Sequence, residues 1–414
     1  MIRILKNFIN KEGTYVFASS LFTKICSFLT SLILIRILSQ DEFGVLSYVL
    51  SALAFFIPFS GAGIQYSYLR YAPMLDDKKN RIALFQHSLF RGLLFSFFLA
   101  LVLFLLIPWL NSGVGNTTIY SSWLIFYLFS FFLIELVKMR YRVADQNKKY
   151  AGIDVYLSFL ILFFGTGLSY FYGPLAYVIV FVTVPLVIGL FHLKVPVKMA
   201  VKIPEKYYSY GIWFGIGGIA SQLMYSLDVF LIGKLIQDPQ QVAFYRSASI
   251  IPIALFFIPN SYITTHYTDL AKNSMDKEYL IRFAKDYIKL FSVLAFFLGT
   301  VLYFMSDFII SILFGEEYAE AAYLFEILIL GMVGAFILRI PFGNILASVG
   351  KSNWNAILAF IILVLNGILN YYAIYAWGIV GAAIVTSTLL WISGILSLAL
   401  FSVYLQKKSL VKRS

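Results

Sequence analysis

Long apolar stretches recur from one end of the chain to the other, and short polar segments separate them. Most stretches hold about 20 residues or more, enough for an α-helix to cross a hydrocarbon core of about 30 Å. The pattern therefore predicts an all-α membrane protein with about twelve transmembrane helices. The expected helices are 14–38, 43–69, 83–110, 118–138, 150–172, 174–194, 208–236, 241–267, 286–306, 320–349, 354–375 and 378–404.

The composition agrees with a membrane protein. The 414 residues are 61% hydrophobic and 13% charged, whereas soluble domains are about 45–50% apolar and about 25% charged. No segment is polar enough to form a soluble domain of any size. The single cysteine, Cys26, lies inside the first predicted helix, so a disulfide within the chain is not expected.

The basic residues predict the orientation of the helices. Of the 32 Lys and Arg residues, 25 lie at the termini or in the even-numbered connections, and the odd-numbered connections carry none. Because cytoplasmic loops carry an excess of Lys and Arg, we expect both termini in the cytoplasm. This bias accounts for most of the +12 net charge, so nucleic acid is not an expected partner. The fourth connection is expected to carry Lys138, Arg140, Arg142, Lys148 and Lys149.

An internal repeat relates the two halves of the chain. The segment LIRILSQDEFGVLSY (34–48) aligns without gaps on LIGKLIQDPQQVAFY (231–245), with seven identities in fifteen positions. Six predicted helices separate the copies, so both have the same orientation. A parallel repeat predicts two six-helix bundles around a central cavity, related by an axis along the membrane normal. We expect lobes at 1–195 and 208–414, joined by a cytoplasmic linker at 196–207.

Seven basic residues cannot be assigned to the loops. A cation at the centre of a membrane helix costs about 2.5–3.5 kcal/mol on insertion scales, so it faces a cavity or a partner unless its side chain reaches the surface. Near a helix end, such snorkelling is as good an explanation as function, and it applies to Arg36, Lys234 and Lys289. The four deeper bases, Lys24, Arg91, Arg246 and Arg339, are candidate anion ligands, with structural interhelical pairing as the alternative.

Acidic residues within the spans are fewer than the basic ones. Only Asp228 and Glu326 are expected to be fully embedded, whereas Glu135, Asp154 and Asp286 lie near cytoplasmic helix ends. Pairing with two acids neutralises two cations and leaves a surplus of positive charge. The sequence therefore predicts a cavity that attracts anions, with Asp228 and Glu326 as counter-ions or as the site of a coupling ion.

Two predicted helices contain residues that bend helices. The second contains IPFSGAG (57–63), and the eighth contains Pro252 and Pro259. Proline removes a backbone hydrogen bond and glycine loosens packing, so both helices are expected to bend. No cofactor motif and no metal-ligand spacing is visible, and the outer loops are short for a membrane enzyme, so we expect a protein that is not an enzyme.

Several segments together resemble one family. The opening FTKICSFLTSLILIRILSQDEFGVLSYVLS resembles the first helix pair of Wzx-type polysaccharide flippases, which belong to the multidrug/oligosaccharidyl-lipid/polysaccharide (MOP) exporter superfamily. The segments LDVFLIGKLIQDPQQVAFYRSAS (227–249), ILFGEEYAEAAYLFEILILG (312–331), GNILASVGKSNW (343–354) and GIVGAAIVTSTLLW (378–391) resemble later parts of the same family.

This resemblance implies a function and a location. The substrate would be an oligosaccharide repeat unit on undecaprenyl pyrophosphate, such as an O-antigen unit, flipped from the cytoplasmic to the periplasmic leaflet of the bacterial inner membrane. Membrane lipids and other polysaccharide assembly proteins are the implied partners. The family's basic residue at the end of the first helix falls on Arg36, which makes Arg36 a further candidate substrate ligand.

Two alternatives stay open at this point. One is a cation-coupled exporter of drugs or other small molecules from the same superfamily, although such proteins tend to rely on embedded acids and this chain has more embedded bases. The other is a membrane enzyme that transfers glycosyl groups.

Overall fold

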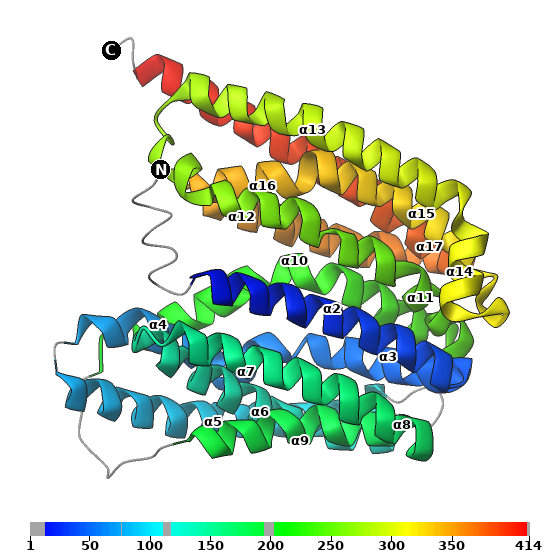
Figure 1. Ribbon diagram of the computed structural model, residues 1–414, viewed down its shortest axis with the longest axis horizontal. Helices are drawn as coiled ribbons and strands as arrows, with labels where there is room; N and C mark the ends of the chain where they lie inside the picture. Colours follow the sequence, from blue (N-terminus) through cyan, green and yellow to red (C-terminus); the bar gives the residue numbers. More distant parts are fainter. Residues whose placement is uncertain (1–12, 76, 111–116, 194–202, 412–414) are drawn as a thin grey trace. The chain divides into compact units, whose positions relative to one another are not determined.

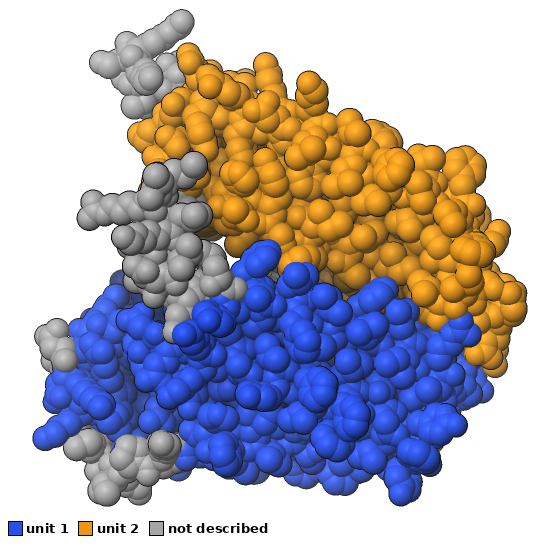
Figure 2. Space-filling view, viewed as in Figure 1, with its two compact units in different colours: residues 1–219 blue, residues 220–414 orange. Residues whose placement is uncertain are grey.

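The computed structural model describes residues 13–75, 77–110, 117–193 and 203–411 (Figure 1). Within these ranges, the side chains of 13–14, 213–222, 268 and 407–411 are not described. All regular secondary structure in the described ranges is helical, so the predicted all-α fold class is confirmed. The chain divides into two compact units, 1–219 and 220–414, which are coloured separately in Figure 2.

The first unit contains the helices of the first six predicted spans. They are α2 (Gly13–Ile37), α3 (Gln40–Ala54), η1 (Ile57–Gly63), α4 (Ile64–Tyr71), η2 (Ala72–Met74), α5 (Lys78–Leu110), α6 (Thr118–Val143), α7 (Asn147–Leu160), η3 (Ile161–Gly165), α8 (Thr166–Tyr172) and α9 (Pro174–His192). Helix α10 (Tyr207–Ile236) begins in this unit and continues into the second.

The second unit contains the rest of α10 and the last five predicted spans. Its other helices are α11 (Pro239–Leu255), α12 (Phe257–Lys272), α13 (Lys277–Phe304), α14 (Ser306–Phe314), η4 (Glu316–Tyr318), α15 (Ala321–Gly334), η5 (Ala335–Arg339), α16 (Ile340–Ser348) and α17 (Ser352–Val411). The predicted linker 196–207 lies largely outside the described residues, so the predicted lobe limits stay a prediction.

The helices have the length and composition of membrane spans. In the described part of the chain, ten helical runs are long and apolar enough to cross a membrane, and the protein is a multi-pass membrane protein. One of these runs, Ser352–Gln406, covers the last two predicted helices, which are separated by a break at Gly378 with φ 58° and ψ −144°. Helix α10 matches the seventh prediction, so the described helices correspond in order to all twelve.

The polar turns of the repeat are helix caps, but they are not equivalent. Before α3, the Ser39 hydroxyl accepts a hydrogen bond from the Glu42 amide at 3.3 Å, and the Ser39 amide donates to the Glu42 carboxylate at 3.0 Å. Before α11, Asp238 Oδ1 accepts from the Gln240 amide at 2.9 Å. In the alignment Asp238 corresponds to Asp41, which lies inside α3, so the capping position differs by two residues between the copies.

Both predicted bends are present. In the second predicted helix, Gly61 and Gly63 adopt φ values of 62° and 70° within η1, a region that glycine occupies at little cost. The Ser60 hydroxyl donates to the Leu128 carbonyl at 2.5 Å, and the Gly61 amide donates to Ser96 Oγ at 3.0 Å. The eighth predicted helix is divided between α11 and α12.

The Phe132 ring of α6 belongs to a hydrophobic core cluster of the first unit and is fully buried. A Cβ atom at Gly61 would lie 2.0 Å from this ring, and one at Gly92 would lie 1.8 Å from it. The absence of side chains at both glycines therefore makes room for Phe132 between η1 and α5. This packing holds the broken second helix in place.

Candidate functional site

A fully buried carboxylate, Asp228 of α10, is the centre of a polar cluster in the second unit. Tyr245 Oη and Thr386 Oγ1 donate to Asp228 Oδ2 at 2.7 and 2.6 Å. Asn370 Nδ2 donates to Oδ1 at 2.6 Å. All of these donors are neutral, so no cation of the described residues compensates the charge of this carboxylate.

Three helices, α10, α11 and α17, bring the cluster together. Asn366 and Asn370 are four residues apart, so they share one face of the first half of α17. Thr386 follows the break at Gly378, and its hydroxyl accepts from Asn366 Nδ2 at 3.2 Å. The Oδ1 atoms of Asn366 and Asn370 are buried and have no hydrogen-bond partner among the described residues. The cluster therefore combines an uncompensated carboxylate with two free amide oxygens.

Arg339 lines a separate cavity of about 290 Å³ in the same unit. Its Nη1 atom donates to Asn355 Oδ1 at 2.8 Å and to Ser397 Oγ at 3.4 Å. No carboxylate of the described residues lies within ion-pair distance of the guanidinium. The cavity is lined by Met224, Tyr225, Phe256, Asn260, Ala335, Arg339, Ile340, Gly343, Asn344, Asn355, Ala359, Ile362, Leu390 and Ser393.

Local backbone features place Arg339. It ends η5, a short π-helical turn, and Pro341, which has no amide proton to donate, follows it in α16. Such turns occur frequently at functional sites. Gly343 lies one turn further, and a Cβ atom there would lie 2.5 Å from Arg339 Nη1 and 2.9 Å from Asn355 Oδ1. Glycine at this position therefore permits the Arg339–Asn355 hydrogen bond.

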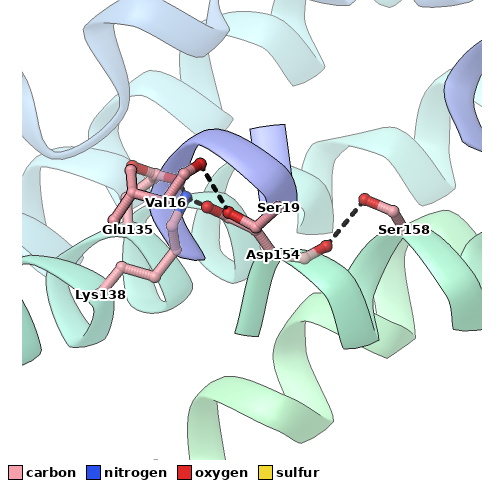
Figure 3. Close-up of polar contacts among 6 residues, drawn as sticks. All are labelled: Val16, Ser19, Glu135, Lys138, Asp154 and Ser158. Atoms are coloured by element: carbon pink, nitrogen blue, oxygen red, sulfur yellow. Dashed lines mark hydrogen bonds and ion pairs between the residues drawn. The ribbon is translucent and has the colours of Figure 1, made fainter. Parts of the chain in front are cut away.

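The first unit holds an ion cluster that differs from the prediction (Figure 3). Lys138 Nζ lies 2.7 Å from Glu135 Oε1 and 2.8 Å from Asp154 Oδ1, and the three side chains are only 10%, 16% and 21% exposed. The assignment of Lys138 to a loop was wrong, because α6 continues to Val143 and its last turns pack against α7. Two carboxylates thus share one buried lysine.

The other predicted site residues occupy different environments. Lys24 and Arg91 are exposed, and neither has an ion pair or hydrogen bond to a described residue. Arg36 is also exposed, whereas Arg246 is half-buried. Glu326 is half-buried and accepts a hydrogen bond from Ser306 Oγ at 2.7 Å. Asp228 and Glu326 therefore lie in separate hydrogen-bond networks.

The sequence reasoning missed the neutral members of the Asp228 cluster. Asn366, Asn370 and Thr386 are ordinary polar residues of membrane helices, and only the spacing of the two asparagines in an apolar segment could have indicated a shared polar face. Tyr245 ends the second repeat segment and aligns with Tyr48 at the end of the first. Tyr48 Oη donates to the Leu110 carbonyl at 2.7 Å, so the two equivalent tyrosines have different partners.

Comparisons with known proteins establish the family. Residues 33–323 match the family described as polysaccharide biosynthesis protein. The chain belongs to this family. The match covers more than half of the chain, and it confirms the resemblance to polysaccharide flippases that the sequence segments indicated.

One relative is a Shigella flexneri protein that is named as an O-antigen transporter. It is 27% identical over 190 residues, which are 45% of this chain. The chain spans only 44% of the length of that relative in this match.

Solved structures show the fold of this family member. An inward-facing multidrug resistance MATE transporter of the MOP superfamily has a TM-score of 0.75 at 15% identity, over 94% of this chain and 96% of that chain. The lipid II flippase MurJ in an inward closed conformation has a TM-score of 0.74 at 17% identity, over 95% and 90%. The chain therefore has the fold of MOP superfamily transporters.

Proposed function

We propose that this protein flips an undecaprenyl-pyrophosphate-linked oligosaccharide, such as an O-antigen repeat unit, from the cytoplasmic to the periplasmic leaflet of the bacterial inner membrane. The observation that carries the proposal is the family match over residues 33–323. The name of the Shigella flexneri relative and the name of the MurJ structure agree with a lipid-linked saccharide as substrate. The excess of Lys and Arg on one side supports cytoplasmic termini.

Basic side chains within the spans would bind the anionic substrate. Lys24, Arg91 and Arg339 have no carboxylate partner among the described residues, so their charges are available to a ligand. Arg36 and Arg246 complete the proposed set of substrate ligands. The pyrophosphate and any acidic sugar of the substrate carry negative charge, and their hydrogen bonds to Lys and Arg are strong in a medium of low dielectric constant. The chain itself breaks no bond of the substrate, and alternating access moves the headgroup.

Asp228 would bind the coupling ion. A fully buried carboxylate with only neutral donors is costly unless a proton or a cation compensates its charge. The free Oδ1 atoms of Asn366 and Asn370 offer further oxygen ligands for a small cation. Glu326 is a second candidate for the coupling ion or a counter-ion, in its own network with Ser306.

Transbilayer movement of a lipid-pyrophosphate oligosaccharide in vesicles tests this proposal. The native chain and Lys24→Ala are compared at matched insertion. Movement by the native chain and its loss in the variant would support both the substrate class and the role of Lys24. Equal movement by both would assign Lys24 a structural role. No movement by the native chain, together with export of cationic drugs from the same vesicles, would support a small-molecule exporter instead.

A further inference from the structure

The Arg339 cavity contains a cation whose hydrogen bonds are incomplete. Only Nη1 of the guanidinium has partners among the described residues, the neutral side chains of Asn355 and Ser397. Arg carries five N–H donors in a fixed fork. The Nη2 and Nε edge therefore remains available to a planar anion, with the side chain held by Asn355.

A second polar group of this cavity has no partner among the described residues. The hydroxyl of Tyr225 is buried and makes no hydrogen bond within the described part of the chain, although its side chain lines the cavity. A buried hydroxyl without a partner costs free energy. Arg339 and Tyr225 together indicate that the cavity is built for a ligand.

The residues that line the cavity favour a ligand with one negative charge and several hydroxyl groups. Among the described residues of the lining, Arg339 is the only charged one, and the other polar members are Tyr225, Asn260, Asn344, Asn355 and Ser393. Asn260 Nδ2 donates to the Phe256 carbonyl at 2.8 Å and Asn344 Nδ2 donates to the Ile340 carbonyl at 2.9 Å, while the contact from Asn344 Nδ2 to Asn260 Oδ1 is long at 3.4 Å. The second N–H of Asn260 and the Oδ1 atom of Asn344 remain able to bind hydroxyl groups. The rings of Tyr225 and Phe256, with centroids 5.9 Å apart, add apolar surface. A pyrophosphate carries more than one negative charge and would need more than one cation in the lining, so a ligand with a single negative charge fits this cavity better.

The volume of the cavity is sufficient for one sugar ring. At about 290 Å³, the cavity lies at the lower end of the roughly 300–1,000 Å³ typical of small-molecule sites. We infer that this cavity of the second unit is a subsite for one acidic sugar, with its carboxylate on Arg339 and its hydroxyl groups on Asn260, Asn344 and Tyr225. The inference rests on the proposed function, which supplies a saccharide substrate.

Binding of free sugars to the purified full chain in lipid nanodiscs tests the subsite. Glucuronate, glucose and inorganic phosphate are titrated separately and followed by ligand-observed NMR. Glucuronate should bind about tenfold or more tightly than glucose, because the hydrogen bond between its carboxylate and the charged Arg339 contributes that factor to the affinity. Inorganic phosphate should bind more weakly than glucuronate. Equal binding of glucose, or equal binding of phosphate, would overturn the inference.

Three variants assign the binding to Arg339. Arg339→Gln should weaken glucuronate binding by about tenfold or more. Gly343→Ala keeps Arg339 in the chain but pushes its Nη1 away from Asn355, so it should weaken the same ligand even if Arg339→Gln folds poorly. Lys289→Gln, which removes an exposed cation from α13 of the same unit, should have no effect. Unchanged binding in both Arg339→Gln and Gly343→Ala would overturn the inference.

A parallel flipping assay separates this inference from the proposed function. Flipping of a lipid-linked oligosaccharide by the native chain, without any binding of glucuronate, would overturn the acidic-sugar subsite and leave the flippase intact. Binding of glucuronate that depends on Arg339, without flipping, would support the subsite and contradict the flippase proposal.

Discussion

Asn370 Nδ2 of α17 lies 2.6 Å from Asp228 Oδ1 of α10, so an amide, and not a basic side chain, meets the buried carboxylate. The residues are 142 positions apart in the chain. Because the partner is neutral, the carboxylate keeps its affinity for a proton or a small cation. A salt bridge at this place would have removed that affinity.

Asp228→Asn should uncouple transport from the ion gradient. The side-chain amide of Asn370 can turn its Oδ1 toward the amide that the substitution introduces, and both hydroxyls of the cluster can rotate, so we expect the variant to fold. Coupling between two sites typically amounts to about 5–150-fold. Flipping in vesicles with and without a sodium or pH gradient should show stimulation of that order for the native chain and none for the variant.

The same assay distinguishes the two ions. Stimulation by a sodium gradient at equal pH assigns sodium, and stimulation by a pH gradient without sodium assigns the proton. Glu326→Gln is the matched control, because it neutralises the acid in the other network. If Asp228→Asn kept the full response and Glu326→Gln lost it, the coupling site would be Glu326.

Lys138→Met should destabilise the first unit. Removal of the lysine leaves Glu135 and Asp154 as two close carboxylates in a largely buried site, and breaking a buried ion pair costs about 3–5 kcal/mol. The measurement is the unfolding temperature of the purified protein in detergent, which should fall clearly below that of the native chain.

A triple variant is the control for this prediction. Replacing all three members, with Glu135→Gln, Lys138→Met and Asp154→Asn, removes the uncompensated charge and should recover much of the lost stability. A Lys138→Met protein as stable as the native chain would show that the cluster is well hydrated in the membrane protein.

Gly61→Ala should be among the most damaging single changes in the first unit. The residue has φ 62°, and a Cβ atom there would lie 2.0 Å from the Phe132 ring. Backbone strain of this kind costs about 1–3 kcal/mol, and overpacking adds about 1–3 kcal/mol. Gly167→Ala is the matched control, since no atom lies within 4 Å of the added Cβ. Unfolding temperatures should fall only for Gly61→Ala, and equal effects would contradict the packing argument.

Cysteine labelling should show whether Lys24 lies in an aqueous path. Cys26 is 3% exposed, whereas Lys24 and Ile25 of the same helix are exposed. In a Cys26→Ala background, Lys24→Cys should react with a membrane-impermeant maleimide in intact membranes, because a deep cation needs water or an anion near it. Ile25→Cys, which is exposed and apolar, should react more slowly. Equal, slow reaction at both positions would place Lys24 against lipid.

The existence and order of the spanning helices follow from the sequence alone, although α6 and α13 extend beyond their predicted ends. A helix that spans a bilayer needs a local run of apolar residues, so each run predicts its own helix without knowledge of its neighbours. The breaks at 57–63 and at Gly378 were predictable for the same reason, because proline and glycine act on their own backbone. Asp228 and Arg339 could be singled out because a charge in an apolar helix is conspicuous.

The tertiary structure alone determines the interaction partners of these charged residues. The sequence predicts a loop position for Lys138, but in the structure Asp154 of α7 forms an ion pair with it. The hydrogen-bond donors to Asp228 are 17 to 158 positions away in the chain. Arg339 lines a cavity with residues of α10, α12 and α17, and Asn355 of α17 accepts a hydrogen bond from its guanidinium. Hydropathy depends on neighbours in the sequence, whereas the pairing or isolation of a charge depends on which helix faces pack together.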